Sequence, residues 1–377
     1  MDLDLSEEQE MLRTTARDFL AKECPKALVR ELEDDPGGYS PELWRKMAEL
    51  GWMGLVIPEE YGGMGMGFMD LIVLLQEMGR NVVPGPFFCT VVTGGLPLLF
   101  AGTEGQKKGL LPKLSDGELI MTMALTEPNA RYDAAGVQTR ATARGDGFII
   151  NGTKLFVEKA HIADYLVCVA RTGEGTEPEH GITLFLVDAK SPGIKCNVVP
   201  TIADDRLCEV EFSNVSVPRS NIMGAVNEGW PLVVRILEHA TMAKCAEMVG
   251  GAEAVLDMTV EYVKERVQYG RPIGSFQVVQ HYCANMWASV GASRNLMYLA
   301  AWKVAEGIAA AHDIAAAKGW INESYKFVTE RAVQCHGAIG LTRDHDLGLY
   351  YRRAKAAELA FGDDNFQREV VARLIGL

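Results

Sequence analysis

The sequence predicts an α+β protein built from three consecutive parts. Apolar residues recur at helical spacing up to about residue 116, alternate in a strand pattern as far as about residue 225, and then return to helical spacing. The length agrees with this division, since 377 residues correspond to two or three domains of roughly 150 residues each. We therefore expect an N-terminal helical domain (residues 1–116), a central β domain (residues 117–225) and a C-terminal helical bundle (residues 226–377).

The N-terminal part contains three predicted helices. Ser6 is followed three residues later by Gln9, which is the spacing of a capping box at a helix start. Pro41 opens a second helix, and residues 70–80 form a third amphipathic stretch. A turn containing proline and glycine at residues 58–63 separates the second helix from the third.

The middle part reads as a series of short strands. Residues 165–172 (YLVCVART), 182–189 (ITLFLVDA) and 208–218 (CEVEFSNVSVP) are typical of strands, and Gly, Asp and Asn lie between them. Residues 145–147 (GDG) predict a hairpin turn. Because no helical segment separates these strands, they indicate an antiparallel barrel or sandwich.

The last part predicts long helices. Residues 230–270 have few breakers apart from the pair Gly250 and Gly251, and residues 276–307 are rich in Ala, Met and large apolar side chains. Helices of this length and composition pack against one another as a bundle.

Composition excludes several classes of partner. There are 37 Lys and Arg against 50 Asp and Glu, a net charge of −13, which disfavours nucleic acid and anionic lipid surfaces. The eight cysteines form no C-x-x-C pair, the first ten residues are acidic and polar, and no apolar run is long enough to span a bilayer. We therefore expect a soluble cytoplasmic protein, without a metal site.

Four motifs follow one another along the chain. They are residues 124–128 (ALTEP), residues 151–159 (NGTKLFVEK), residues 265–277 (ERVQYGRPIGSFQ) and residues 334–340 (QCHGAIG), the last followed by residues 351–355 (YRRAK). Together they resemble the acyl-CoA dehydrogenase family over essentially the whole chain. Each motif alone is only moderately specific, but their order across three parts of the right type makes the resemblance specific.

The resemblance implies the acyl-CoA dehydrogenase fold: a helical N-terminal domain, a central β-barrel and a C-terminal four-helix bundle, with FAD between barrel and bundle. It also implies an acyl-CoA substrate, an electron-transferring flavoprotein as electron acceptor, and a homo- or hetero-oligomer arranged as a dimer of dimers. The cofactor contacts that it implies are Leu125 and Thr126 with the flavin ring, Phe156 against that ring, Arg266 and Gln277 with the FAD of a neighbouring subunit, and Gln334, Gly337 and Gly340 near the adenine. A guanidinium suits a diphosphate, and glycine admits close backbone approach.

Each of these residues also has a structural interpretation that needs no cofactor. Arg266 can be a solvated charge at a helix end, Gly337 and Gly340 can serve a turn, and Phe156 can belong to the barrel core. The family match favours cofactor contact for Arg266 and for residues 334–340.

The sequence departs from the family where the catalytic base is expected. The usual Glu near the C-terminus aligns with Phe361, and the alternative Glu on an early bundle helix aligns with Ala240. Thr241 replaces the Arg that helps to hold the substrate. In the loop that follows Thr126-Glu127-Pro128 (the TEP loop), Arg131 and Tyr132 stand before Asp133, where the family usually has Gly-Ser. Glu158 replaces a small hydroxyl residue near flavin N5. Glu158 either disfavours an anionic reduced flavin or turns outward to pair with Lys159 or Arg131.

Other residues near these positions are candidate bases. They are His239, Asp363, Asp364, Glu358 and Glu238. A neutral imidazole can accept a proton near pH 7, whereas Asp363 and Asp364 also fit a helix N-cap. Residues 84–91 (PGPFFCTV) resemble an acyl-pocket loop that carries an Asp base in family members acting on alicyclic thioesters. Here the loop offers Phe88, Cys89 and Thr90, which with Phe361 are expected to line the substrate pocket.

Three hypotheses about function follow. The first is an FAD-dependent oxidoreductase that acts on a bulky or alicyclic acyl-CoA with non-standard base chemistry. The second is a subunit without a base in a hetero-oligomeric acyl-CoA dehydrogenase. The third is a non-oxidative FAD-dependent lyase or decarboxylase, in which no Cα proton has to be removed.

Overall fold

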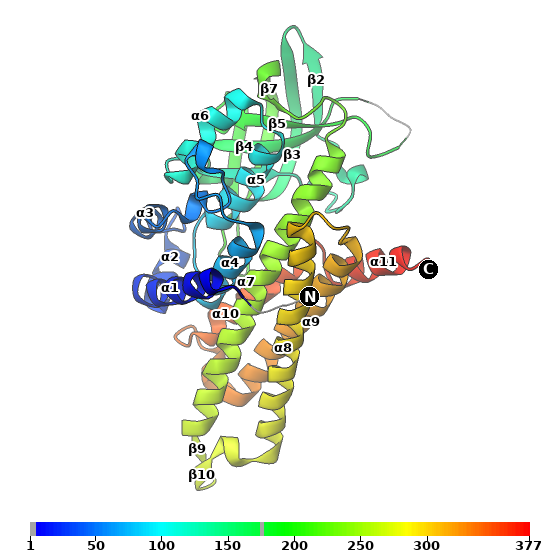
Figure 1. Cartoon of the computed structure of the whole chain (residues 1–377). Helices are drawn as coiled ribbons and strands as arrows, with labels where there is room; N and C mark the ends of the chain where they lie inside the picture. Colours follow the sequence, from blue (N-terminus) through cyan, green and yellow to red (C-terminus); the bar gives the residue numbers. More distant parts are fainter. Residues whose placement is uncertain (1–4, 174–176) are drawn as a thin grey trace. The chain divides into compact units, whose positions relative to one another are not determined.

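The computed structural model describes residues 5–173 and 177–377, so the first four residues of the acidic N-terminus lie outside the described part. The elements follow the predicted order of helices, strands and helices (Figure 1). Internal contacts divide the chain into two units. The helical unit comprises the N-terminal residues up to Arg30, Gly67–Val83 and Thr241–Leu377, and the sheet unit comprises Glu31–Met66 and Pro84–Ala240.

The helices are α1 (Glu7–Glu23), α2 (Lys26–Asp34), α3 (Pro41–Glu49), α4 (Phe68–Arg80), α5 (Leu96–Ala101), α6 (Glu104–Ser115), α7 (Trp230–Glu265), α8 (Gln277–Ala305), α9 (Ala311–His336), α10 (Leu347–Leu359) and α11 (Asp364–Leu374). The predicted capping box starts α1, because the Gln9 N–H donates to Ser6 Oγ and the Ser6 N–H donates to Gln9 Oε1, both at 3.2 Å. Pro41 opens α3 as predicted.

In the helical unit, α9 packs against α8, α10 and α11, and Figure 1 shows α8 and α9 side by side. Helix α7 runs without a break through Gly250 and Gly251. A Cβ atom on Gly250 would lie 1.8 Å from the Gln76 carbonyl oxygen, and one on Gly79 would lie 2.0 Å from that of Glu247. These two glycines therefore permit the close approach of α4 to α7.

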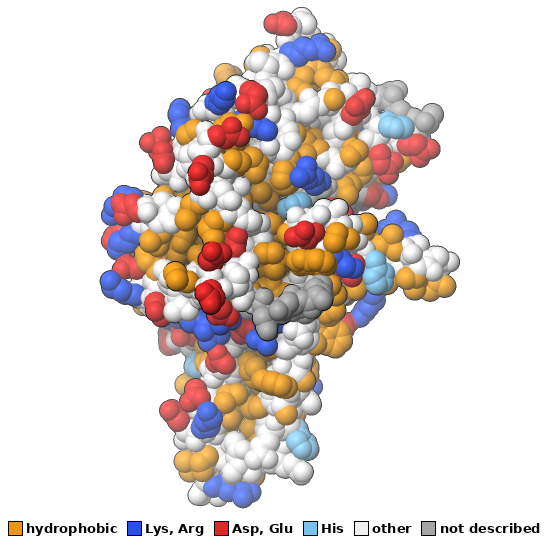
Figure 2. Space-filling view, viewed as in Figure 1, with side chains coloured by type: hydrophobic (Ala, Val, Ile, Leu, Met, Phe, Trp, Pro, Cys, Tyr) orange, Lys and Arg blue, Asp and Glu red, His pale blue; other side chains and the backbone are white. Residues whose placement is uncertain are grey.

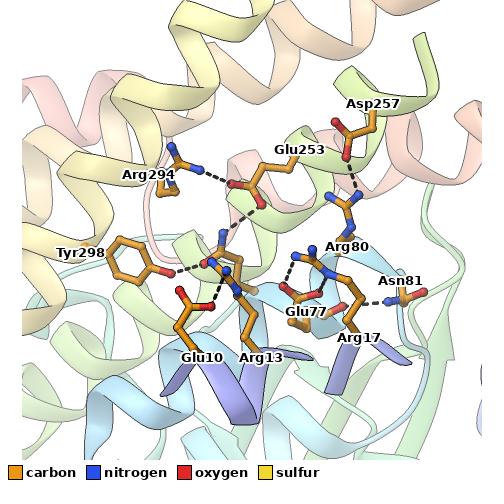
Figure 3. Close-up of polar contacts among 11 residues, drawn as sticks. Glu10, Arg13, Arg17, Glu77, Arg80, Asn81, Glu253, Asp257, Arg294 and Tyr298 are labelled. Carbon is orange, nitrogen blue, oxygen red and sulfur yellow. Dashed lines mark hydrogen bonds and ion pairs between the residues drawn. The ribbon is translucent and has the colours of Figure 1, made fainter. Parts of the chain in front are cut away.

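A polar network ties α1, α4, α7 and α8 together (Figure 3). Arg17 donates from Nε and Nη2 to the buried carboxylate of Glu77, at 2.9 and 2.6 Å. Gln76 donates to Glu253 Oε2 at 3.0 Å and accepts from the Tyr298 hydroxyl at 2.6 Å. Burial raises the pKa of Glu253, so folding disfavours the ionised form of this carboxyl.

Replacing Glu253 by Gln is expected to stabilise the protein at neutral pH. Folding raises the pKa of Glu253 and therefore favours its protonated form. The stability that this protonated carboxyl contributes is fully present below the unfolded-state pKa, and it is lost as the pH rises through the folded-state pKa. Glu253→Gln removes this loss and keeps an acceptor for Gln76. Thermal unfolding from pH 4.5 to 8 checks this, and the gain in Tm should shrink toward acid pH. Glu261→Gln, at an exposed site on α7, is the control, and a lower Tm for Glu253→Gln at pH 8 would contradict the expectation.

The strands are β1 (Met121–Ala124), β2 (Arg140–Arg144), β3 (Gly147–Glu158), β4 (Tyr165–Arg171), β5 (Ile182–Asp188), β6 (Ile194–Val199), β7 (Leu207–Pro218) and β8 (Ile222–Met223), with a short pair β9 (Val267–Gln268) and β10 (Arg271–Pro272). The main sheet has the order β6-β7-β3-β2-β4-β5-β8, and β1 pairs in parallel with β4. The predicted hairpin turn joins β2 to β3. No pairing between β6 and β8 closes this sheet into a barrel within residues 5–173 and 177–377.

One segment of the sheet unit differs from its predicted form. Residues 84–91 are expected as a loop, yet Phe88–Gly95 forms a π-helix, η3. A Cβ atom on Gly94 would lie 2.5 Å from the Met121 side chain, so glycine allows this turn to pack directly on β1. Single π-helical turns are rare and are frequent at functional sites.

The surface shows no separation of charge on the visible face, where acidic and basic side chains are intermixed (Figure 2). Among the helices of the described residues, none combines the length and the apolar character needed to cross a membrane. The described residues also contain no cluster of three or more His, Cys, Asp or Glu suited to a metal ion.

Candidate functional site

The first group of predicted site residues follows β1 in the sheet unit. The Leu155 N–H donates to the Thr126 carbonyl at 2.8 Å, and Lys154 Nζ donates to the Leu125 carbonyl at 3.0 Å. The backbone of Leu125 and Thr126 is thus fixed against β3 by two hydrogen bonds.

Phe156 lies beside this edge on an irregular part of β3. The β3–β7 register shifts between Lys154 and Val157, and Phe156 has φ 56°, a left-handed conformation that is unusual for a bulky residue. The side chain is 49% exposed, so it is not part of the sheet core. The bulge turns an aromatic ring outward beside the Leu125–Thr126 backbone.

A buried ion pair supports the same edge and was not anticipated from the sequence. Lys154 Nζ lies 2.7 Å from Glu127 Oε1, and the two side chains are 0% and 4% exposed. The Glu127 carboxylate also accepts from the N–H groups of Gln138 and Thr139, each at 2.9 Å. The pair therefore connects β3, the residues after β1 and the two residues before β2.

Glu158 is half-buried at the end of β3. Its two suggested partners have other contacts, because Arg131 pairs with Asp133 and Lys159 donates to the Gly38 carbonyl at 3.0 Å. The hydrogen bond from Arg131 lowers the pKa of Asp133. The ion pair between Arg131 and Asp133 thus lies within the TEP loop itself.

Phe88, Cys89 and Thr90 form the first turn of η3, and all three are buried. Cys89 Sγ donates to the Pro86 carbonyl at 3.2 Å, and Thr90 Oγ1 accepts from the Met121 N–H at 3.4 Å. These contacts fix η3 against the strand that leads to Leu125 and Thr126.

A second group lies in the helical unit. Arg266 follows the last residue of α7, and Gln277 is the first residue of α8, so the two exposed side chains flank the β9–β10 hairpin. One turn before Arg266, the Tyr262 ring stacks on His336 with 4.3 Å between centroids. This contact places the end of α7 next to the end of α9.

The Gln334–Gly340 segment begins in the last turn of α9 and continues into η8 (Gly337–Leu341). Gln334 and Gly337 are exposed, whereas Gly340 is buried, and Gly337 has φ 68° and ψ −147°, which favours glycine. His336 Nε2 is buried and has no hydrogen-bond partner in the described part of the chain. An orphaned polar atom beside an exposed glycine turn suits a polar ligand such as the adenosine part of FAD.

The position of the usual base is rigidly held. Phe361 is half-buried between α10 and α11 with φ 59°, and its carbonyl accepts from Gln367 Nε2 at 2.9 Å. The buried Lys318 donates to Asn322 and to the Ala357 carbonyl, the latter at 3.0 Å. Side chains of α9 and α11 thus fix the backbone in the turn before Phe361 and at Phe361 itself.

The carboxylates next to Phe361 have other roles. Asp363 accepts from the Phe366 N–H at 2.9 Å and is the N-cap of α11. Burial raises the pKa of Asp364, and Glu358 pairs with Lys355 at 3.4 Å. Asp363 therefore has the helix-capping function that its position allows.

The alternative base position lies on α7. Ala240 is fully buried, and Thr241 is the next residue, also buried. His239 donates from Nδ1 to the Arg235 carbonyl at 2.8 Å, and burial lowers its pKa to about 4. Burial also raises the pKa of Glu238. His239 is thus neutral near pH 7 and is a weak base for a carbon acid.

Comparison with known proteins agrees with this arrangement. Residues 6–118, 122–215 and 227–376 match the N-terminal, middle and C-terminal domains of acyl-CoA dehydrogenase. The caffeyl-CoA reductase-Etf complex subunit CarC of Acetobacterium woodii is 30% identical, with 98% of each chain covered. A chain of the ChsE4-ChsE5 complex from Mycobacterium tuberculosis superposes with a TM-score of 0.92 at 28% identity, covering 100% of both chains. A chain of the Tcur3481-Tcur3483 steroid ACAD has a TM-score of 0.88 at 31% identity, covering 98% of each.

The motifs, the three matched domains and the solved structures agree. The chain belongs to the acyl-CoA dehydrogenase family of FAD-dependent flavoprotein oxidoreductases.

Proposed function

We propose that this protein oxidises or reduces a CoA thioester with a bulky or alicyclic acyl group. Phe361 carries this proposal, because it puts an aromatic ring where the family usually has a catalytic Glu. An aromatic side chain makes the lining of the acyl pocket more apolar and favours an apolar ring system over a short linear chain. The likeness to a chain of a steroid ACAD supports the same substrate class.

The residues present fit FAD. Leu125 and Thr126 offer a fixed backbone edge to the isoalloxazine, and the exposed Phe156 ring offers a stacking surface. The family resemblance supports a role for Arg266 in binding the pyrophosphate of an FAD held by a neighbouring subunit, and a role for the Gln334–Gly340 segment in binding its adenine. When bound, FAD supplies the hydride acceptor or donor for Cβ of the thioester.

A second candidate function is that of a subunit whose partner supplies the base. Two observations favour it: Phe361 and Ala240 carry no proton acceptor, and His239 has a pKa of about 4. The likeness to a chain of a two-component complex supports this assembly. For both candidate functions we propose that an electron-transferring flavoprotein exchanges electrons with the FAD. The likeness to an Etf complex subunit supports this partner.

Absorption spectroscopy tests both functions. The purified protein is expected to show flavin absorbance that is bleached anaerobically by a cyclic acyl-CoA but not by butyryl-CoA. If bleaching requires a co-expressed paralogue that contains the Glu, the subunit function is correct. If a thioester is converted without any electron acceptor and without net oxidation, the third hypothesis, a lyase, replaces both.

Arg266→Ala is expected to weaken FAD binding by about 10- to 100-fold, since a charge-assisted hydrogen bond contributes about 1.5–3 kcal/mol. Flavin retained after gel filtration and the Kd from fluorescence titration measure this effect. Arg271→Ala is the matched control, because Arg271 is an exposed arginine on the same β9–β10 hairpin. Equal losses in the two variants would contradict a specific contact between Arg266 and the cofactor.

A further inference from the structure

Two cysteines lie together on one face of the sheet, away from the family motifs. On the antiparallel strands β6 and β7, Cys196 is opposite Val210 and Cys208 is opposite Val198. Residues two apart on a strand point to the same side, so Cys196 and Cys208 are diagonal neighbours on one face. Both are free thiols, and no disulfide joins them.

His161 forms the third member of this cluster. Its Nδ1 lies 3.6 Å from Cys208 Sγ, and its Nε2 lies 3.1 Å from the Pro36 carbonyl oxygen. Because a carbonyl only accepts, Nε2 carries a proton and Nδ1 faces the sulfur. This is the arrangement in which a histidine activates a cysteine. In the thiol form, the Cys208 S–H also donates to the Arg206 carbonyl, with 3.8 Å between sulfur and oxygen.

The protonation of this cluster sets it apart from the other cysteines. The adjacent Cys196 thiol and His161 lower the pKa of Cys208, whereas Cys208 and burial raise the pKa of Cys196. Cys208 is therefore the sulfur of the pair that loses its proton more readily. Burial raises the pKa of the other cysteines for which a shift is resolved, Cys24, Cys168, Cys245, Cys283 and Cys335.

Solvent reaches this cluster of three residues from the side of Cys196. Cys208 is fully buried on the inner strand β7, whereas Cys196 is half-buried on the edge strand β6. A small oxidant therefore reaches the pair from the side of Cys196, and a large thiol reagent does not reach Cys208 directly.

We propose that Cys196 and Cys208 are a redox-active dithiol that closes to an intramolecular disulfide when it meets a peroxide. The Cys208 thiolate attacks one oxygen of the peroxide, the O–O bond breaks, and Cys208 becomes a sulfenic acid, while the other oxygen leaves as water after protonation. The second sulfur then displaces the hydroxyl group as a second water and forms the S–S bond. In total, two thiols and one hydrogen peroxide give one disulfide and two waters, and a small thiol reverses the change.

Peptide mapping of the full-length protein tests this proposal. The reduced protein is treated with one equivalent of hydrogen peroxide and then unfolded in urea, the remaining thiols are alkylated, and the digest is analysed by mass spectrometry with and without later reduction. We expect a reducible Cys196–Cys208 cross-link and alkylation of the other six cysteines. Full alkylation of Cys196 and Cys208 after peroxide, or a cross-link between any other pair, would overturn the proposal.

Variants separate the roles of the three residues. Cys196→Ser and Cys208→Ser should each leave the remaining sulfur to progress to sulfinic acid. His161→Asn should slow disulfide formation about tenfold, because less thiolate is present near neutral pH. Cys283→Ser is the control at another half-buried cysteine and should leave the rate unchanged. An unchanged rate in His161→Asn, with the cross-link intact in wild type, would remove His161 from the mechanism.

Discussion

Replacing Lys154 by Met is expected to destabilise the sheet unit by about 3–5 kcal/mol and to reduce its flavin content, the largest stability effect that we predict for this chain. Lys154 is 0% exposed and lies 2.7 Å from Glu127, so the variant leaves a buried carboxylate without its counter-charge. The N–H groups of Gln138 and Thr139 still donate to Glu127, but they do not neutralise it.

Loss of flavin follows from the second contact of Lys154. Its ammonium group also donates to the Leu125 carbonyl, which belongs to the backbone edge proposed to face the isoalloxazine. Without this donor the edge keeps the hydrogen bond between the Leu155 N–H and the Thr126 carbonyl but loses the one to Leu125. Urea unfolding followed by tryptophan fluorescence, with flavin content measured in parallel, checks both effects.

Two variants make this result specific. Lys195→Met removes the lysine of an exposed pair with Glu211, on neighbouring strands of the same sheet, and should cost less than about 1 kcal/mol. The double variant Lys154→Met/Glu127→Gln removes both buried charges and should recover part of the lost stability. The expectation is wrong if Lys154→Met unfolds at the same urea concentration as Lys195→Met.

Much of the fold could be predicted from the sequence because its signals are local. The change from helical to alternating period identified the helices and the strands, and the Ser6–Gln9 spacing identified the start of α1. Gly250 and Gly251 were less informative, because a glycine that ends a helix and one that allows close packing are alike in sequence. The π-helix at Phe88–Gly95 also has no local signal, since its form depends on packing against Met121.

The candidate site shows the same limit. The motifs located Leu125, Arg266 and Gly337, because each belongs to a short conspicuous segment. The pair of Lys154 with Glu127 was missed although both residues lie in motifs, because 27 residues separate them and they meet only when the loop after β1 folds against β3.

Phe361→Glu is expected to create or to raise dehydrogenase activity toward linear acyl-CoA esters by about 10²–10⁴-fold, the usual contribution of a positioned base. The variant puts a carboxylate at the position from which most family members remove the Cα proton. The backbone at position 361 tolerates the Phe→Glu substitution. Residue 361 already has φ 59°, and the free-energy cost of this left-handed conformation is about the same for Glu as for Phe.

The fixed surroundings of residue 361 favour a productive geometry in this variant. Gln367 holds its carbonyl, and Lys318 holds the carbonyl of Ala357 in the turn before it. These contacts involve backbone oxygens and therefore do not depend on the side chain at position 361. Anaerobic stopped-flow bleaching of the flavin by butyryl-CoA measures the rate of the first half-reaction.

Phe361→Gln is the matched control, because it has the size and polarity of Glu without a basic carboxylate. If a missing base alone prevents wild type from oxidising linear thioesters, Glu restores bleaching and Gln does not. If both variants retain flavin and neither is bleached, residue 361 does not face Cα of the substrate, and the departure from the family extends beyond the base. If both are bleached equally, the Phe361 ring blocks linear substrates by its bulk, and the base belongs to another residue or to a partner subunit.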